Sequence, residues 1–568
     1  MALNSALGIG RSALTAYQAA LSVVGQNIAN AGTPGYSRAS ARLAALSGTG
    51  LNTGQLGGGV RLDAVRRNVN ESLNARLRLS GSDQQSALAQ RSSLSRVEGI
   101  FDPLGGDNLG SLLSQFFGSL SDLQNTPENP ASRGIVVNTA TALVQRIGDV
   151  REQLIGLRKD LNVDVEDAVI QADAIATKIA EINVQISSTE AATGGPASAL
   201  RDERDRLLTS LSEYFSITVK EQPSGAVNVF VGNASLVQFG ESFGIYTSNE
   251  VNADGLNVAV VRFKIDNGPV NAGSGIVKGL IESRDTHAGT QLARLDTLAA
   301  AVISEVNRIH AGGKGLKDFT NVTGLTGVID PSLALSAADN GVAFPPQTGS
   351  FFIDVKDTAT GQVVRTQIHI DLDGIGADSS LNSVAADISA NVPNLTATVL
   401  ADGRLQLSSA SGYSFSFADD TSGALGALGI NTFFGGSDAL TIKLNPTIVS
   451  DPSYIAAGQS GLSGDGGNAT ALASLADTAV AGLGGVSLNA YYNATMADIA
   501  VRSSGAQSAL DASGIVFDSL TAQREAVSGV NLDEEAVALI SYQRAYQGAA
   551  EYMRVVDEML QVLLGLVR

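Results

Sequence analysis

The sequence contains no cysteine and no tryptophan among its 568 residues. Without cysteine the chain can form neither disulfide bonds nor thiolate metal sites. Histidine is also scarce: the three residues His287, His310 and His369 lie far apart, which argues against a histidine-rich metal site. No run of 18 apolar residues occurs, so no transmembrane helix is expected. The first residues also lack the pattern of a cleaved secretory signal, so we expect any export to use another route.

Positive charge is in short supply overall but not at the N-terminus. The 37 basic and 56 acidic residues give a net charge of −19, which disfavours binding to nucleic acid or to an anionic membrane. Residues 1–80 nevertheless contain eight arginines against Asp63 and Glu71, whereas residues 532–568 contain six acidic residues against three arginines. Opposite charge on the two end segments favours their pairing.

Both end segments repeat apolar residues every three and four positions, the a/d pattern of a coiled coil. A helix with so narrow an apolar stripe needs a partner, and we predict that the two ends pair and mediate assembly with other molecules. The alternative is that both are ordinary core helices of a globular domain. The predicted assembly interface comprises Leu3, Leu7, Leu14, Tyr17, Leu21, Val24, Ile28, Leu539, Tyr542, Tyr546, Met553, Val556, Leu560 and Leu563.

Between the ends, the sequence predicts an α+β multidomain protein in which β-rich segments are inserted into a helical frame. Helical periodicity is longest over residues 131–190, which would span about 90 Å as one helix. Strand-like alternation dominates residues 216–284 and 315–455. We therefore predict four parts: a terminal axial core, a helical rod domain, a β-rich segment and an outward β-rich insertion. Their predicted boundaries are 1–66 with 525–568, 67–212 with 285–314 and 456–524, 213–284, and 315–455.

Several short motifs match catalytic or metal-binding patterns without the context that such patterns need. Gly240–Gly244 fits the G-x-S-x-G nucleophile elbow around Ser242, but the following residues continue as strand or turn rather than helix. The loop at Asp371 lacks two ligands of a calcium-binding loop, which leaves open only a calcium-stabilised turn. The alternating charges of residues 201–206 predict exposed ion pairs on a helix. We expect no catalytic residues, no metal site and no cofactor.

A short motif after the first helix, together with the last segment of the chain, resembles one protein family. The Asn-Ile-Ala-Asn-Ala-Gly-Thr-Pro-Gly-Tyr-Ser-Arg segment is similar to a motif of axial proteins of the bacterial flagellum, and its Pro-Gly-Tyr-Ser-Arg form most resembles the flagellar hook-associated protein 1 family. The segments at 528–535 and 542–546 resemble the end of the same family. The residues of this turn motif are Asn27, Asn30, Thr33, Pro34, Gly35, Tyr36, Ser37 and Arg38.

The resemblance implies a structural subunit rather than an enzyme. Members of this family are exported through the flagellar type III channel without a cleaved signal, and they form a ring between hook and filament outside the cell. Their terminal helices build the inner tube, and their middle domains face outward. The implied partners are other copies of the chain, the hook protein, the second junction protein and through it flagellin, and an export chaperone. Neither nucleic acid nor a membrane is an implied partner.

Two alternatives stay open from the sequence. Within the same class, the chain could be another flagellar axial protein, either the hook protein or flagellin. Flagellin is not expected to carry the Pro-Gly-Tyr-Ser-Arg turn, and the hook protein is expected to lack the long helix at 131–190. From another class, a secreted hydrolase rests only on Ser242 and on scattered carboxylates.

Overall fold

The computed structural model shows an α+β protein made of long helices and several small antiparallel sheets, which confirms the predicted fold class. The described residues are 2–47, 50–51, 54–55, 57–101, 108–252 and 255–566. The chain divides into two compact units. Unit 1 contains residues 1–93, 160–283 and 504–568, and unit 2 contains residues 94–159 and 284–503. The four-part division expected from the sequence is finer than this and stays a prediction.

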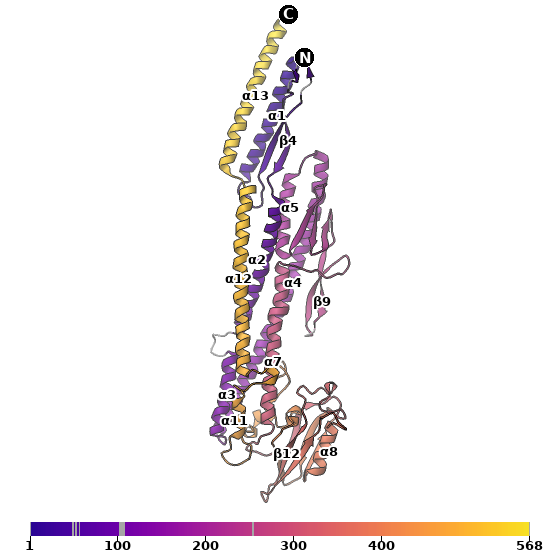
Figure 1. The fold of residues 1–568 in the computed structure, drawn as a ribbon, viewed down its shortest axis with the longest axis vertical. Coiled ribbons are helices and arrows are strands. Elements are labelled where there is room, and N and C mark those ends of the chain that lie inside the picture. The colour runs from indigo at the N-terminus through magenta and orange to yellow at the C-terminus, as the bar shows by residue number, and fades with distance from the viewer. Residues whose placement is uncertain are drawn as a thin grey trace. The chain divides into compact units, whose positions relative to one another are not determined.

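In unit 1 the first and last helices pack side by side (Figure 1). These are α1 (Ala2–Ala29) and α13 (Leu532–Leu566). Their directions are opposite, because Gly10 lies beside Met553 while Asn27 bonds to Glu535. The predicted pairing of the two ends is therefore confirmed.

A twisted hairpin lies against another face of α1. Strand β1 (Ala39–Ala45) pairs with β4 (Val60–Arg67), and a register shift between Arg42 and Leu43 marks a bulge. Two short strands, β2 (Gly50–Leu51) and β3 (Gly54–Gln55), pair with each other in the connection. The segment after the turn motif thus forms a hairpin that packs against one side of α1.

In the rest of unit 1, small sheets follow the helix α5 (Ser198–Tyr214) in the chain. A four-stranded sheet has the order β5-β6-β7-β8, and β9 pairs with β10. The Gly240–Gly244 segment forms β8 and a turn that leads into β9, so no helix follows Ser242 and the nucleophile elbow is absent there. The bounds are β5 (Ile217–Glu221), β6 (Val227–Val231), β7 (Ala234–Gln238), β8 (Glu241–Ser242), β9 (Ile245–Val251), β10 (Asn257–Phe263), α6 (Ile276–Glu282) and the π-helical turn η1 (Ser283–Ala288).

Three long helices contribute residues to both units: α2 (Glu71–Phe101), α4 (Pro130–Thr193) and α12 (Leu488–Ser528). The 64-residue α4 confirms the long helix predicted from periodicity. The apolar residues that recur every three or four positions from Leu143 to Leu161 are buried. Near the C-terminal end, Ala176 and Asn183 are buried in place of Ile175 and Ile182, because an ideal helix drifts away from a seven-residue repeat.

Unit 2 combines helices with two three-stranded antiparallel sheets of order β11-β15-β14 and β13-β12-β16. Their facing sides and α8 enclose a closed apolar core that includes Phe351, Ile353, Leu407, Phe415 and Phe417. The bounds are α3 (Leu109–Asn125), α7 (Gly289–His310), β11 (Asn321–Gly327), η2 (Ala338–Asn340), β12 (Gly349–Asp357), β13 (Val363–Ile370), α8 (Leu381–Asn391), β14 (Leu395–Val399), β15 (Arg404–Ser409), β16 (Tyr413–Ala418), α9 (Ala424–Ala427), β17 (Phe434–Gly435), β18 (Lys443–Leu444), α10 (Pro446–Ser450), η3 (Pro452–Tyr454), α11 (Gly467–Ser474) and η4 (Ala481–Leu483).

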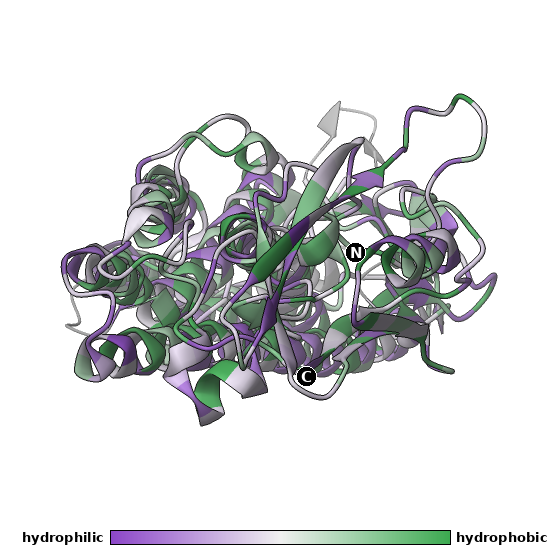
Figure 2. Ribbon diagram, turned by 90° about the horizontal axis from the view of Figure 1, so that it is seen from below, coloured by the Kyte–Doolittle hydropathy of each residue, from purple (hydrophilic) through white to green (hydrophobic). Residues whose placement is uncertain are grey.

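Hydrophobic and hydrophilic residues are interleaved along the helices and strands, as the colouring of Figure 2 shows. Such interleaving is typical of elements that bury one side and expose the other. Within the described part of the chain, no helix combines the length and the apolar character needed to cross a membrane.

Candidate assembly interface

The predicted seam residues of α1 and α13 are buried to very different degrees. Val24 and Val556 are buried, and Ile28 is exposed. The side chains of Leu3 and Leu563 lie outside the described residues. The other predicted seam residues are half-buried: Leu7, Leu14, Tyr17, Leu21, Leu539, Tyr542, Tyr546, Met553 and Leu560. One chain therefore covers only part of the seam that its own two ends form.

Close approach of the two helices depends on a glycine. A Cβ atom at Gly10 would lie 2.7 Å from Cγ of Met553 and 3.2 Å from Cδ1 of Tyr552. Both distances are shorter than ordinary carbon–carbon contacts, so a larger residue at position 10 would push α13 away. The flexible Met553 side chain fills the space that the glycine leaves.

The turn motif is organised around the side chain of Asn27, which is buried in the last turns of α1. Its Oδ1 accepts hydrogen bonds from the Tyr36 hydroxyl at 2.8 Å and from the Ala39 backbone N–H at 3.0 Å. Its Nδ2 donates to the Ala39 carbonyl at 2.8 Å and to Oε2 of Glu535 at 3.0 Å. All four bonding positions of the amide are thus used. Asn27 ties together α1, the turn, β1 and α13.

The chain reverses between Asn30 and Tyr36 through backbone hydrogen bonds. The Thr33 N–H donates to the Asn30 carbonyl at 2.9 Å, and the Tyr36 N–H donates to the Thr33 carbonyl at 3.2 Å. Gly35 has a φ of 81°, and a Cβ atom there would lie 2.6 Å from Cγ of Arg206. Glycine is required at this position both by the left-handed backbone and by the contact. Pro34 is exposed at the tip of the turn.

Arg38 connects the turn to the start of α13. Its Nε lies 2.7 Å from Oε1 of Glu535, and its Nη1 lies 2.8 Å from Oε2 of Glu534. The Glu535 side chain is only 2% exposed, whereas that of Glu534 is 58% exposed. The Arg38 N–H also donates to the Ser528 carbonyl at 2.9 Å, at the end of α12. Because Glu535 stands in the first turn of α13, the helix dipole also favours its negative charge.

A second charged cluster joins Arg67 of β4 to α5. It shows that the expectation of exposed ion pairs over residues 201–206 is wrong in part. The residues at 201–206 do form ion pairs, but Asp202 and Arg204 are buried rather than exposed, because this face of α5 packs against neighbouring segments. Arg67 approaches Asp202 at 3.1 Å, without hydrogen-bond geometry, and pairs closely with Asp205. Arg204 donates to the Gly225 carbonyl at 2.7 Å.

Burial shapes the protonation of this cluster. Burial raises the pKa of Asp202, although the Arg67 charge and hydrogen bonds from Ser37 act in the opposite direction. Burial, and secondarily the negative charges of Asp202 and Glu535, raise the pKa of Tyr36. The Tyr36 hydroxyl therefore stays protonated and can donate to Asn27.

The sequence identified Asn27, Tyr36 and Arg38 as members of the motif but not their partner Glu535. An acidic residue in the first turn of a helix is common, since the helix dipole favours it, and so carries no special signal. The pairing of Arg67 with α5 was missed for a similar reason, because it joins segments that are far apart in the sequence. The one signal in the sequence was Asn27 itself, an amide beside the apolar repeat, since a buried amide needs polar partners.

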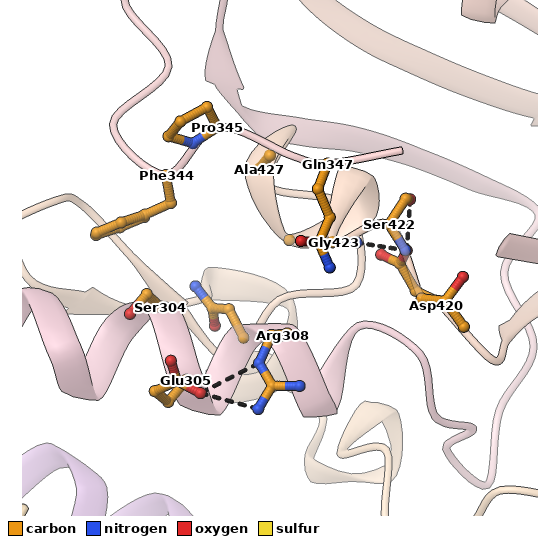
Figure 3. A pocket seen from close by; sticks show the side chains of 13 residues that line it. Ser304, Glu305, Arg308, Phe344, Pro345, Gln347, Asp420, Ser422, Gly423 and Ala427 are labelled. Carbon is orange, nitrogen blue, oxygen red and sulfur yellow. Dashed lines mark hydrogen bonds and ion pairs between the residues drawn. The ribbon is translucent and has the colours of Figure 1, made fainter. Parts of the chain in front are cut away.

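A cavity in unit 2 illustrates that, among the residues the structure describes, carboxylates on a cavity wall can have purely structural partners. A cavity of about 480 Å³ in unit 2 is lined by residues of α7 and by loops near Phe344 and Asp420 (Figure 3). Glu305 pairs with Arg308 at 2.9 Å. Asp420 accepts hydrogen bonds from the N–H groups of Ser422, Gly423 and Leu425, and burial raises its pKa. Both carboxylates on this cavity wall thus have structural partners.

The loop at Asp371 gathers carboxylates without a complete ligand set. Oxygen atoms of Asp371, Asp373 and Asp378 lie within 4.8 Å of one another at the surface. The Gly374 N–H donates to Asp378, and the Ile375 N–H donates to Asp373, so these carboxylates stabilise the loop itself. Asn382, at position twelve of the supposed calcium loop, lies within α8.

Comparison with known sequences gives consistent matches to flagellar proteins. Residues 94–324 match the flagellar hook-associated protein FlgK helical domain. Residues 523–566 match the C-terminal region of flagellar basal body rod FlgEFG proteins, and residues 7–36 match flagella basal body rod proteins. The last two matches contain Asn27, Tyr36, Glu535 and most of the predicted seam residues, but not Leu3 or Arg38.

Relatives are similar over almost the whole chain. The chain is 26% identical to flagellar hook-associated protein 1 of Salmonella typhimurium over 588 aligned residues, covering 99% of this chain and 100% of the relative. It is 24% identical to flagellar hook-associated protein 1 of Escherichia coli K12, with the same coverage. The solved structure of the flagellar hook junction protein FlgK from Burkholderia pseudomallei has a similar fold, with a TM-score of 0.52 and 15% identity, covering 80% of this chain and 100% of that one.

Proposed function

The chain belongs to the flagellar hook-associated protein 1 family, and on that premise we propose how its terminal helices serve the junction between hook and filament. It is a structural protein of the bacterial flagellum, an extracellular component of the hook–filament junction and not an enzyme. The observation that carries the proposal is the incomplete burial of the α1–α13 seam within one chain.

In the proposed assembly, α1 and α13 of each copy form the axial core of a ring. Fully burying one large apolar side chain stabilises a contact by about 1.5–3 kcal/mol, and a half-buried side chain can gain roughly half of that. Many of the nine half-buried seam residues must therefore contribute together to offset the cost of association. The predicted interface residues, from Leu7 to Leu560, are thus the source of assembly energy. The basic first segment and the acidic last segment support the same arrangement by charge.

The Asn27–Glu535 cluster sets the direction in which this helix pair leaves the rest of unit 1. Asn27, Tyr36 and Arg38 bind α13 to the turn and hairpin through buried hydrogen bonds and an ion pair. A buried polar network of this kind is satisfied in only one geometry. We infer that it aligns every copy in the ring identically.

The remaining parts have a proposed role each. Residues 1–66 with 525–568 form the axial core, and residues 67–212 with 285–314 and 456–524 form the helical domain around it. The β-rich segment 213–284 and the insertion 315–455 face outward. The partners are other copies of the chain, the hook protein on one side, the second junction protein and through it flagellin on the other, and an export chaperone before assembly.

The proposal is tested by placing a charge on the seam. Leu21→Asp and Leu560→Asp each bury an unpaired carboxylate in the assembled core, at a cost of several kcal/mol per copy. In cells whose own copy is replaced by the variant, we expect loss of the junction and accumulation of unpolymerised filament subunit in the medium. Gln561→Asp puts the same charge on the exposed side of α13 and should assemble normally. Normal assembly of Leu560→Asp would contradict the proposal.

A further inference from the structure

The α13 helix carries a second apolar stripe that its own chain leaves uncovered. Tyr552, Val555, Met559 and Val562 follow the spacing 3-4-3 and are 41%, 42%, 49% and 63% exposed. These positions form a face adjacent to the seam residues Met553, Val556 and Leu560, since successive residues turn by about 100°. Tyr552, at the start of the stripe, also lies against α1 of the same chain beside Gly10, whereas Val555, Met559 and Val562 point away from the seam.

A groove runs along α1 on the side away from α13. Two cavities of about 470 and 680 Å³ share the lining residues Ala19 and Leu62, so they lie next to each other along α1 and β4. Apolar atoms of Ala16, Val23 and Leu62 line the groove. Its α1 wall includes small or short residues at the spacing 4-3-4-3, namely Gly8, Ser12, Thr15, Ala19 and Ser22, together with the longer Arg11 and Gln26.

The wall of this groove can be covered without leaving hydroxyl groups unsatisfied. The Ser12 hydroxyl donates to the Ile9 carbonyl at 2.8 Å and accepts from the Val60 N–H at 3.3 Å. The Thr15 hydroxyl donates to the Arg11 carbonyl at 2.9 Å. Because both hydroxyls already have partners within the chain, covering Ser12 and Thr15 leaves neither of them unsatisfied. Space is also available, since a Cβ atom at Gly8 would meet nothing within 4 Å.

Charge and length point to the occupant of the groove. Arg11, Arg61 and Arg206 line it against one acidic residue, Asp202, and the Arg61 side chain is 60% exposed although it pairs with Asp63 at 3.3 Å. The α13 stripe is flanked by Glu551, Asp557 and Glu558, of which Arg554 offsets one. The groove wall from Gly8 to Ser22 is about 21 Å long and the stripe from Tyr552 to Val562 about 15 Å, at 1.5 Å per residue. The stripe is shorter than the groove, its centre is apolar, and its acidic edges match the arginines that line the groove.

We propose that the exposed stripe of α13 docks into the groove between α1 and β4 of a second copy of the chain. Within one chain α13 already occupies a different face of α1, so the contact joins unlike surfaces of successive copies. Heterologous contacts of this kind propagate around a ring or along a helix. This inference rests on the proposed function and specifies which surfaces meet.

Engineered disulfide bonds test the contact, because the natural chain has no cysteine to interfere. Chains carry one cysteine in the groove, at Ser12, Thr15, Ala19 or Ser22, and one in the stripe, Val555→Cys or Met559→Cys. This scan covers the axial offsets that neighbouring copies could adopt. Each groove cysteine is also combined with Gln561→Cys as a control, because that residue lies on another face of α13. Hook ends are purified, oxidised and separated on a denaturing gel without reductant.

We expect at least one groove–stripe pair to give a ladder of covalent multimers, with none from the Gln561→Cys controls. Absence of a ladder from every pair would overturn the inference, provided that the chain is present in the hook ends. Equal ladders from the controls, or an internal bond that yields only monomer, would overturn it as well. If the unsubstituted chain were absent from purified hook ends, the proposed function itself would fail, so the two failures are distinguishable.

Discussion

The insertion around β12 and the terminal helix pair bury their apolar residues in opposite ways. In the insertion, Phe351, Phe415 and Phe417 are at most 1% exposed and belong to one closed core. Among the described side chains of α13, by contrast, only Glu535 and Val556 are buried. The first region completes its core within one chain, whereas the second leaves its seam half-buried, and we propose that other copies of the chain cover the rest.

The difference shows how one sequence separates folding from assembly. A closed core fixes the structure of a domain at any concentration, because all of its contacts are intramolecular. Helices with half-buried stripes gain their remaining stability only by mass action with neighbouring copies. The polar cluster around Asn27 shares a feature with each region. It is buried within one chain and fixes the start of the helix pair, but it does not cover the apolar stripes.

The largest expected effect is a difference in thermal stability between a variant in the closed core and a variant on the exposed stripe. Phe417→Ala removes a fully buried ring and should destabilise the insertion by about 3–5 kcal/mol, which lowers its calorimetric transition by about 10 °C. Val555→Ala, on the exposed stripe, should change the melting of the monomer by less than about 0.5 kcal/mol. If both variants melted alike, the contrast between a closed and an open core would be wrong.

The stability of unit 2 should depend on pH, because a histidine is buried at the end of α7. His310 accepts from the Ala456 N–H and contacts the Asn431 carbonyl, and burial lowers its pKa to about 4. The unfolded chain binds this proton near pH 6.5 but the folded chain does not, so stability falls as the pH drops from 6.5 to 4. The expected loss is about 3 kcal/mol, measured from urea midpoints. It should vanish in His310→Phe and persist in His369→Gln, whose histidine is exposed.

A smaller effect is expected at the Asn27 cluster. Glu535→Gln keeps an acceptor for Asn27 or Arg38 but removes the charge, which should loosen the start of α13 by about 1 kcal/mol. Limited proteolysis of the monomer should then cut faster near the link between α12 and α13. Glu534→Gln, whose side chain is 58% exposed, serves as the control. Equal cleavage of the two variants would mean that burial of Glu535 contributes nothing to this joint.

The sequence predicted what periodicity and local motifs encode. The seven-residue repeats led to the paired ends, and the turn residues located Asn27 and Arg38. The sequence could not predict which polar residues are buried by segments far away in the chain. In the sequence Glu535 looks like an ordinary acidic residue of a first helical turn, and the charges around Asp202 look like an exposed helix face. The second stripe of α13 was also missed, because Tyr552, Val555 and Met559 are conspicuous only once the first seam is seen to be occupied by α1.

Hydrogen–deuterium exchange of the free chain and of chain in purified hook ends tests the central claim most directly. The account predicts that amides of α1 and α13 exchange much faster in the monomer than those of β12 and β16, and gain strong protection on assembly, while the insertion changes little. Equally slow exchange of α13 and β12 in the monomer, with no further protection in the assembled form, would contradict it.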